Sequence, residues 1–122
     1  CSEIEWERAA RGADARRYPH GDSLRPTDAS YFGTYGELPA AVGLDEVGSH
    51  PDSDSPFGVH DLAGNAFEWV TSDLRSSPDD IAVFRSGSYY QSEVELRAEN
   101  RNPGIPTTRD IRCGLRICAP WK

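Results

Sequence analysis

The sequence predicts a small single domain with one N-terminal helix, a few short strands and long irregular loops. A length of 122 residues gives room for one hydrophobic core. Hydrophobic residues make up 37% and charged residues 27% of the chain, which is typical of globular proteins. Neither a membrane-spanning run nor a signal peptide is visible in the sequence. Because the chain opens at Cys1, directly before a predicted helix, we expect its first residue to be a cut rather than a natural start.

The helix is predicted from the capping-box spacing of Ser2 and Glu5. The Ser2 hydroxyl can accept from an amide of the first turn, while the Glu5 carboxylate reaches back to the amide of Ser2. Gly12 can end the helix, and Trp6 is expected to pack on the core.

The following segment, residues 13–56, is expected to lack regular structure because Pro and Gly interrupt every window of it. Such a long irregular segment needs to be held in place by buried aromatic side chains, arginine ion pairs or a metal ion. The candidate aromatic residues are Tyr18, Tyr31, Phe32 and Tyr35.

Short strands and turns are expected in the second half of the chain. They comprise a buried turn at 57–69, a solvated turn at 76–80, a hairpin element at 81–90, a second short element at 96–101, a Pro/Gly loop at 102–106 and a closing strand at 111–119.

The charge distribution argues against a nucleic-acid partner. The net charge is −7, and residues 45–80 hold nine carboxylates against Arg75 alone. Nucleic-acid phosphates need a basic surface, whereas an acidic segment favours cations. Twelve of the 13 basic residues are arginines, which suit fixed bidentate ion pairs.

Three cysteines, Cys1, Cys113 and Cys118, cannot all pair within the chain. Cys113 and Cys118 are five residues apart in a strand-like run, so their side chains are expected on opposite faces and should not bridge each other. Two alternatives remain open. Cys1 forms a disulfide with one of them and joins the two ends of the chain, or all three thiols are reduced and buried.

Six sequence blocks, taken together and in order, resemble the formylglycine-generating enzyme/sulfatase-modifying factor family. They are SEIEWERAARG (2–12), YPHGD (18–22), FGVHDLAGNAFEW (57–69), FRSGSY (84–89), RAENR (97–101) and GLR (114–116). The resemblance implies an α+β, C-type-lectin-like fold that is loop-rich, with little regular secondary structure. It also implies that residues 1–122 are the C-terminal portion of a single domain within a bacterial protein, cytoplasmic or exported. We therefore expect the N-terminal part of the same domain, or another polypeptide chain, as a partner.

The resemblance further implies a structural calcium site in the turn that contains Asn65 and Glu68, with main-chain carbonyls of Gly64 and Ala66. Oxygen ligands of this kind suit calcium. The alternative is that Asn65 and Glu68 cap local backbone and pair with an arginine. A second family calcium site would fall at residues 29–31, but Ser30 replaces the usual carboxamide there, so that site is not expected.

The family's copper-dependent oxidation is not expected. Related enzymes carry two cysteines after the Gly-Ser of FRSGSY, since thiolates are the ligands that copper(I) prefers. Here the stretch at 89–95 reads YYQSEVE and contains no cysteine. The three histidines, His20, His50 and His60, have no metal-motif spacing, and His20 and His60 are interpreted as packed rings.

A ligand-binding surface is predicted around Tyr90, Gln91, Arg101 and Asn102, where related enzymes hold a substrate peptide. Aromatic residues and arginine dominate binding hot spots. The alternative is that Tyr89 belongs to the core and that Arg101 pairs with Glu68 or Asp61.

We therefore expect a non-catalytic recognition or scaffolding module for a peptide or protein ligand. The alternatives are a divergent metal-dependent oxidase completed by a missing N-terminal chain, and a diversified ligand-binding protein.

Overall fold

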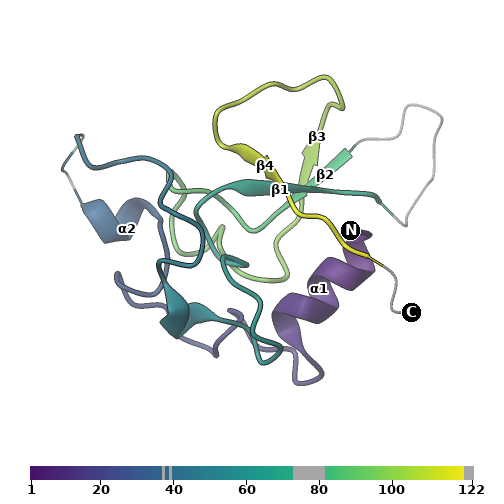
Figure 1. The fold of residues 1–122 in the computed structure, drawn as a ribbon, viewed down its shortest axis with the longest axis horizontal. Helices are drawn as coiled ribbons and strands as arrows, with labels where there is room; N and C mark the ends of the chain where they lie inside the picture. Colours follow the sequence, from purple (N-terminus) through teal and green to yellow (C-terminus); the bar gives the residue numbers. More distant parts are fainter. Residues whose placement is uncertain (37, 39, 73–81, 120–122) are drawn as a thin grey trace.

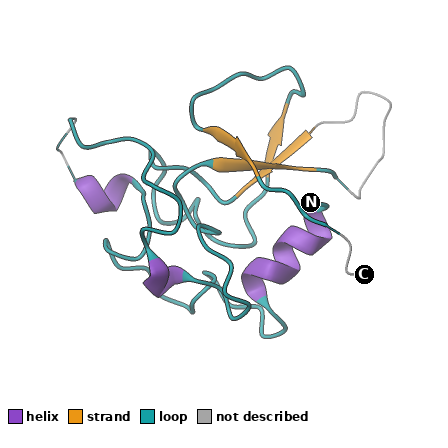
Figure 2. Cartoon of the chain, viewed as in Figure 1, coloured by secondary structure: helices purple, strands orange, loops and turns teal. Residues whose placement is uncertain are grey.

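The computed structural model describes residues 1–36, 38, 40–72 and 82–119, and it consists mostly of loops (Figures 1 and 2). The predicted turn at 76–80 and the first residue of the predicted hairpin element lie outside this part of the chain. The elements are α1 (Glu3–Arg11), α2 (Phe32–Tyr35), a 3₁₀ turn (Pro51–Ser53), β1 (Phe67–Val70), β2 (Ala82–Arg85), β3 (Asn102–Gly104) and β4 (Cys113–Leu115). This architecture confirms a loop-rich α+β fold.

The strands form one mixed sheet in the order β3-β2-β1-β4. β1 pairs antiparallel with β2, placing Glu68 opposite Arg85, and parallel with β4, placing Glu68 opposite Gly114. β3 and β4 are therefore the two edges of the sheet among the described strands. In Figure 1 the sheet lies on one side of α1.

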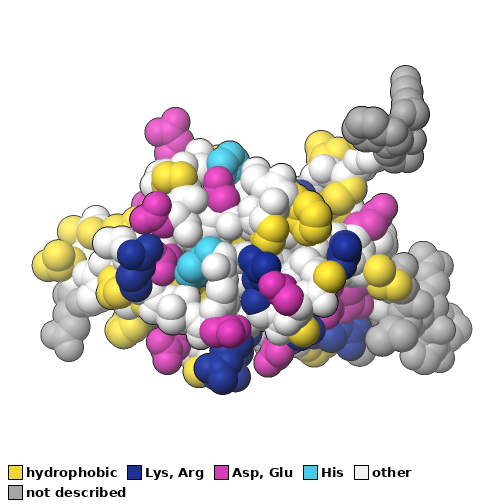
Figure 3. All heavy atoms as spheres, turned by 90° about the horizontal axis from the view of Figure 1, so that it is seen from below, with side chains coloured by type: hydrophobic (Ala, Val, Ile, Leu, Met, Phe, Trp, Pro, Cys, Tyr) yellow, Lys and Arg dark blue, Asp and Glu magenta, His cyan; other side chains and the backbone are white. Residues whose placement is uncertain are grey.

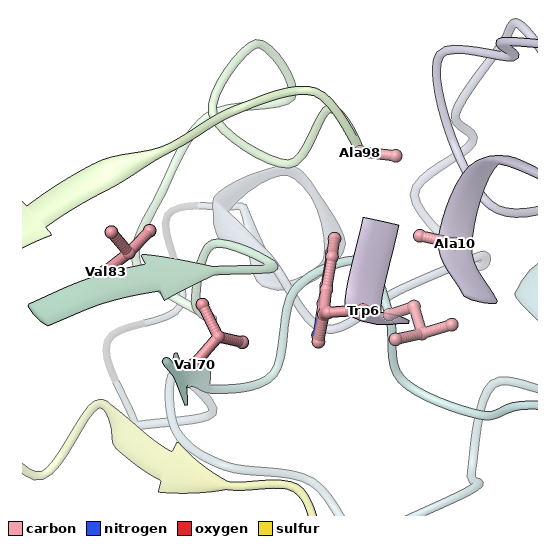
Figure 4. Packing of buried hydrophobic residues seen from close by; sticks show 6 residues of the cluster. Trp6, Ala10, Val70, Val83 and Ala98 are labelled. Carbon is pink, nitrogen blue, oxygen red and sulfur yellow. The ribbon is translucent and has the colours of Figure 1, made fainter. Parts of the chain in front are cut away.

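The core lies between the sheet and α1. Trp6 projects from the helix toward Val70 of β1 and Val83 of β2 (Figure 4), and it is 1% exposed. The remaining buried members of this cluster are Ala10, Leu62 and Ala98. The predicted packing of Trp6 on the core is confirmed.

The first helix has the predicted caps. The Glu5 amide donates to the Ser2 Oγ over 3.2 Å, and the Ser2 amide donates to the Glu5 carboxylate over 2.8 Å. Gly12, at φ 63°, ends the helix, and its amide donates to the carbonyl of Arg8. Both boundaries follow from residues close in sequence, so the spacing alone predicted them.

Aromatic side chains hold part of the long irregular segment, as expected. Tyr18 and Tyr31 are buried in a second cluster with Ala29, Ala63 and Leu96. Phe32, however, is exposed, and so is Phe57, the first residue of the turn at 57–69 that was expected to be buried.

The strands at the sheet edges differ from expectation. The residues predicted as a Pro/Gly loop at 102–106 begin with β3, where Pro103 lies opposite Val83. Proline is tolerated there because β3 is an edge strand that needs hydrogen bonds on one side only. The element expected at 96–101 is a series of turns, and the closing strand is limited to Cys113–Leu115.

A disulfide joins Cys1 to Cys118, with their Cα atoms 4.7 Å apart. Cys113 is a free cysteine, and it does not bridge Cys118, as the opposite-face argument predicted. Of the two alternatives, the structure therefore contains the disulfide that joins the two ends of the chain. No described helix is long and apolar enough to cross a membrane.

Candidate functional site

The predicted metal-binding turn lines a pocket of about 480 Å³ between β1, the β4 segment and two loops. Asn65, Ala66 and Glu68 belong to its lining, whereas Gly64 does not. The rest of the lining consists of Val47, Asp61, Gly114, Leu115, Arg116 and Ile117. The structure thus gathers three of the four predicted ligands and adds a second carboxylate, that of Asp61.

Close backbone packing shapes the turn. The Gly64 amide donates to the Ser86 carbonyl over 3.1 Å, and the Asn65 amide donates to the Ser30 carbonyl over 2.8 Å. Gly64 has φ 80°, and a Cβ there would overlap the Ser30 carbonyl, so only glycine fits. Asn65 has φ 61°, a left-handed conformation that asparagine tolerates better than most residues.

The Asn65 carboxamide caps the backbone of a neighbouring loop. Its Oδ1 accepts from the amide of Asp45 over 3.0 Å, and its Nδ2 donates to the Asp45 carbonyl over 3.3 Å. The alternative of local backbone capping therefore describes Asn65 in this structure.

Glu68 is buried on β1 and accepts three hydrogen bonds. Trp6 Nε1 donates to Oε2 over 2.6 Å, and Arg116 donates through Nε to Oε2 over 2.7 Å and through Nη2 to Oε1 over 2.5 Å. Arg116 also donates to the His60 carbonyl over 2.8 Å. The alternative prediction, that Glu68 pairs with an arginine, describes Glu68 in this structure, and the partner is Arg116.

The lining combines oxygen ligands with the Arg116 guanidinium, which already pairs with Glu68. Asp61 and Glu68 offer carboxylates, Asn65 a carboxamide and Ala66 a main-chain carbonyl, all of them oxygen ligands that calcium accepts. The Asp61 carboxylate is buried and accepts from the Gly48 amide over 2.8 Å. Within the described residues, no three Asp, Glu, His or Cys side chains cluster as a metal site would. Calcium would therefore need main-chain or carboxamide ligands beside these two carboxylates.

The four predicted ligand-binding residues form two pairs of neighbours, Tyr90 with Gln91 in one loop and Arg101 with Asn102 at the start of β3. Tyr90 is 61% exposed, as expected, but Gln91 is half-buried and its carbonyl accepts from the Phe32 amide of α2. Arg101 pairs with Glu3 of α1, and Asn102 opens β3. Tyr89 is buried, in agreement with the alternative that it belongs to the core.

Ion pairs beside α1 were not predicted. The pairing of Arg101 with Glu68 or Asp61 is wrong, because its guanidinium contacts both oxygens of Glu3. Arg85 is fully buried and donates to Glu3 and Glu7, each over 3.0 Å. The Arg101 guanidinium, together with Arg85, holds the pKa of the Glu3 carboxyl below its ordinary value despite the opposing effect of burial. The excess of arginine was the one sequence signal for this network.

The histidines have separate environments. His20 is half-buried and stacks on Tyr18, as predicted for a packed ring. His60 is exposed and lies 2.7 Å from an Asp54 oxygen, so its interpretation as a packed ring is wrong. His50 lies 2.8 Å from an Asp45 carboxylate oxygen, beside the turn of Asn65.

The fold and pocket together define a small loop-rich α+β domain whose mixed sheet lies against one capped helix. The family model described as sulfatase-modifying factor enzyme 1-like domain matches residues 1–120, so the chain belongs to this family.

Relatives in the family include enzymes and an inactive protein. The chain is 35% identical to formylglycine-generating enzyme of Mycobacterium tuberculosis, over 98% of this chain and 40% of that protein. It is 32% identical to hercynine oxygenase of the same organism, over 95% of this chain and 31% of that protein. It is 30% identical to inactive C-alpha-formylglycine-generating enzyme 2 of Bos taurus, over 97% of this chain and 42% of that protein. The chain thus spans about a third to two fifths of these relatives.

Solved structures share the fold. PvdO from Pseudomonas aeruginosa aligns with a TM-score of 0.74 at 24% identity, covering 93% of this chain and 49% of that chain. Treponema denticola variable protein 1 aligns with a TM-score of 0.73 at 22% identity, covering 93% and 44%. The predicted family resemblance is confirmed, whereas the likeness to C-type lectins stays a prediction.

Proposed function

We propose that this chain is a non-catalytic recognition or scaffolding module of the sulfatase-modifying factor family. The observation that carries the proposal is the state of its cysteines. Cys1 and Cys118 are joined to each other, and Cys113 is a single free thiol whose pKa is raised by burial. A copper site of the family type needs two adjacent thiolates, and the stretch at 89–95 supplies none.

The partner in this proposal is the remaining part of the family domain or another polypeptide chain. Exposed aliphatic side chains beside the pocket support it, because such a patch on a soluble domain marks a contact surface. Val47 is 79%, Leu115 73% and Ile117 84% exposed. Tyr90, Gln91, Arg101 and Asn102 remain the proposed contacts for a peptide or protein ligand. A nucleic-acid ligand is not favoured, since arginines and carboxylates alternate on the face seen in Figure 3 rather than forming a basic patch.

A structural calcium ion is the proposed cofactor. The Asn65 and Glu68 side chains and the Ala66 carbonyl would hold it, and Asp61 lines the same pocket. The Gly64 carbonyl, the fourth predicted ligand, lies outside the lining and accepts from Ser86 Oγ. Bound calcium would link β1 to the irregular loops. Arg116 already contacts both oxygens of Glu68, so its guanidinium would have to turn away before calcium could use this carboxylate.

Thermal unfolding with calcium or with a chelator tests the calcium site. A ligand that binds only the folded state at a hundred times its Kd stabilises by about 2.7 kcal/mol, so calcium should raise the Tm by several degrees. The variant N65A/E68A should not show this calcium-dependent rise. Its Tm should also be lower without calcium, because Glu68 no longer pairs with Arg116.

The matched control is N100A/E99A, which removes the same residue types from the loop before β3 and should keep the rise. A wild-type Tm that does not respond to calcium would contradict the proposed site. Magnesium at the same concentration checks that the effect is not general screening of the carboxylates.

A further inference from the structure

A second pocket, here called the α1 pocket, lies along the outer face of α1 and has a volume of about 540 Å³. Ile4, Arg8 and Arg11 follow one another at spacings of four and three residues, so they share one face of the helix. Trp6 and Ala10 point from the other face into the core (Figure 4). The rest of the lining consists of Glu3, Glu7, Gly12, Ala13, Ala15 and Arg101. Of the four predicted ligand-binding residues, only Arg101 therefore lines this pocket.

The two carboxylates of the α1 pocket are neutralised from within the protein. Arg85 is fully buried outside the lining and donates to both Glu3 and Glu7. Arg101 contacts both oxygens of Glu3, and Arg11 donates to Glu7 over 2.8 Å. The acidic groups of the lining are thus occupied before any ligand enters.

The arginines of the α1 pocket keep donors that the protein does not use. The guanidinium of Arg8 is exposed, lies 5.8 Å from the centroid of the Phe57 ring, and has no hydrogen bond or ion pair within the described residues. Arg11 Nε is buried without a hydrogen-bond partner, and Arg11 Nη2 lies 3.8 Å from a Glu99 oxygen. Even when Glu99 is counted, four arginines face three carboxylates here, although the whole chain has a net charge of −7. The site therefore has a local positive charge and free donors.

Apolar groups complete the α1 pocket. Ile4, Ala13 and Ala15 contribute aliphatic surface, and the methylene stems of the arginines add to it. Asp14, beside Gly12, pairs with Arg16 and so adds no net charge. The volume falls within the range of roughly 300–1,000 Å³ that is usual for ligand sites, and it exceeds what a single carboxylate fills. The lining is thus complementary to a carboxylate that has an aliphatic neighbour.

We propose that the α1 pocket binds an acidic peptide segment of a partner protein. A carboxylate of the segment pairs with Arg8, and an adjacent aliphatic side chain packs against Ile4 and Ala13. A long polyanion such as a nucleic acid is disfavoured, because the protein as a whole is acidic. This inference rests on the recognition function proposed above and adds the pocket and the chemistry of its ligand.

An NMR titration of isotopically labelled protein with the peptide acetyl-GELEG-amide tests the proposal. The amide signals of Gly12, Ala13 and Ala15 should shift and should saturate with a Kd of about 1 mM or below, which corresponds to about −4 kcal/mol. The neutral peptide acetyl-GQLQG-amide has nearly the same shape and should leave these signals in place. The two peptides together separate recognition of the carboxylates from apolar contact alone.

The variant R8Q should weaken binding of the acidic peptide about tenfold, because a charge-assisted contact is lost. It should fold normally, since Arg8 has no hydrogen bond or ion pair within the described residues. R109Q is the matched control: Arg109 is also exposed and without such a partner in the described part of the chain, but it does not line the pocket. R109Q removes the same charge and should bind the peptide as wild type does.

The possible outcomes separate this inference from the proposed function. Equal weakening by R8Q and R109Q would overturn the site, because net charge alone would then attract the peptide. Shifts centred on Tyr90 and Gln91 instead would overturn the α1 pocket and leave the recognition function standing, and an absence of any shift at several millimolar peptide would overturn the pocket as well. Stoichiometric copper in the purified protein would contradict the non-catalytic function, whereas the titration of the α1 pocket would be unaffected by that result.

Discussion

At the scale of single residues, the environment of His50 determines its charge. Nδ1 lies 3.0 Å from the Thr27 carbonyl and Nε2 lies 2.8 Å from the Asp45 carboxylate. Since neither acceptor carries a proton, both ring nitrogens are placed to donate, which favours the imidazolium form. Burial lowers the pKa of His50, but the bonds to Asp45 and Thr27 outweigh burial, so the pKa is raised above 6.5.

The raised pKa of His50 predicts the sign of a pH effect on stability. A group whose folded pKa exceeds its unfolded pKa stabilises fully below the unfolded value and loses this contribution as pH rises through the folded value. Its facing groups do not reverse this trend: the pKa of Asp45 is lowered, and burial raises that of Tyr35. H50Q should therefore cost about 1–2 kcal/mol near pH 6 and clearly less at pH 9.

Urea unfolding between pH 5.5 and 9 measures this difference for wild type and H50Q. Asp61 also contributes to the field at His50 and is unchanged in both proteins. H60Q is the matched control, because His60 is half exposed and pairs with Asp54 at a different place. A constant offset between wild type and H50Q across this range would contradict the assigned role of His50.

How far single contacts could be predicted depends on sequence separation. The bonds between Ser2 and Glu5 span three residues, and the capping-box spacing identified them. Glu68 and Arg116 are 48 residues apart, so only the folded chain reveals that they pair. The carboxylate and carboxamide of the turn were predicted as ligands, but their protein partners were not predictable from local pattern.

At the scale of elements, β3 depends on close packing at Gly104. A Cβ at this position would overlap the ring of Phe84, which is itself buried and lies 3.8 Å from the Trp69 ring, centroid to centroid. The sequence around it, Asn-Pro-Gly, is typical of a loop and predicted one. Pairing with β2 overrides that local preference, which explains why the strand could not be predicted.

The substitution G104A tests this packing. Phe84 would have to shift against Trp69, and overpacking of this kind costs about 1–3 kcal/mol. G43A is the matched control, because a Cβ at Gly43 meets nothing within 4 Å. Urea unfolding of the two variants makes the comparison. If G104A were as stable as G43A, the contact between Gly104 and Phe84 would not be a constraint on the sheet.

At the scale of the whole molecule, six blocks spread over the chain identified the family, and the family model covers residues 1–120. The family blocks predicted the arrangement of the loop-rich fold. Irregular loops have no hydrophobic periodicity, so their structure could not be predicted from local sequence alone. The sequence left the disulfide as one of two alternatives, because two cysteines can pair only when they lie close in space, and the sequence does not give that distance. Only the folded chain brings Cys1 and Cys118, 117 residues apart in sequence, together.

Closing nearly the whole chain into one covalent loop should contribute strongly to stability. Loops of roughly a hundred residues give about 4–5 kcal/mol in the chain-entropy model, which is a large share of the roughly 5–15 kcal/mol typical of a domain. C1S/C118S should therefore unfold at much lower urea concentration than wild type, and reduced wild type should behave alike. C113S removes a cysteine of the same chain without opening the loop, so it should lose far less. Urea midpoints at equal protein concentration decide the matter. A loss in C1S/C118S no larger than in C113S would mean that the packing of Trp6 and the pair of Glu68 with Arg116 hold the two ends together without the covalent bond.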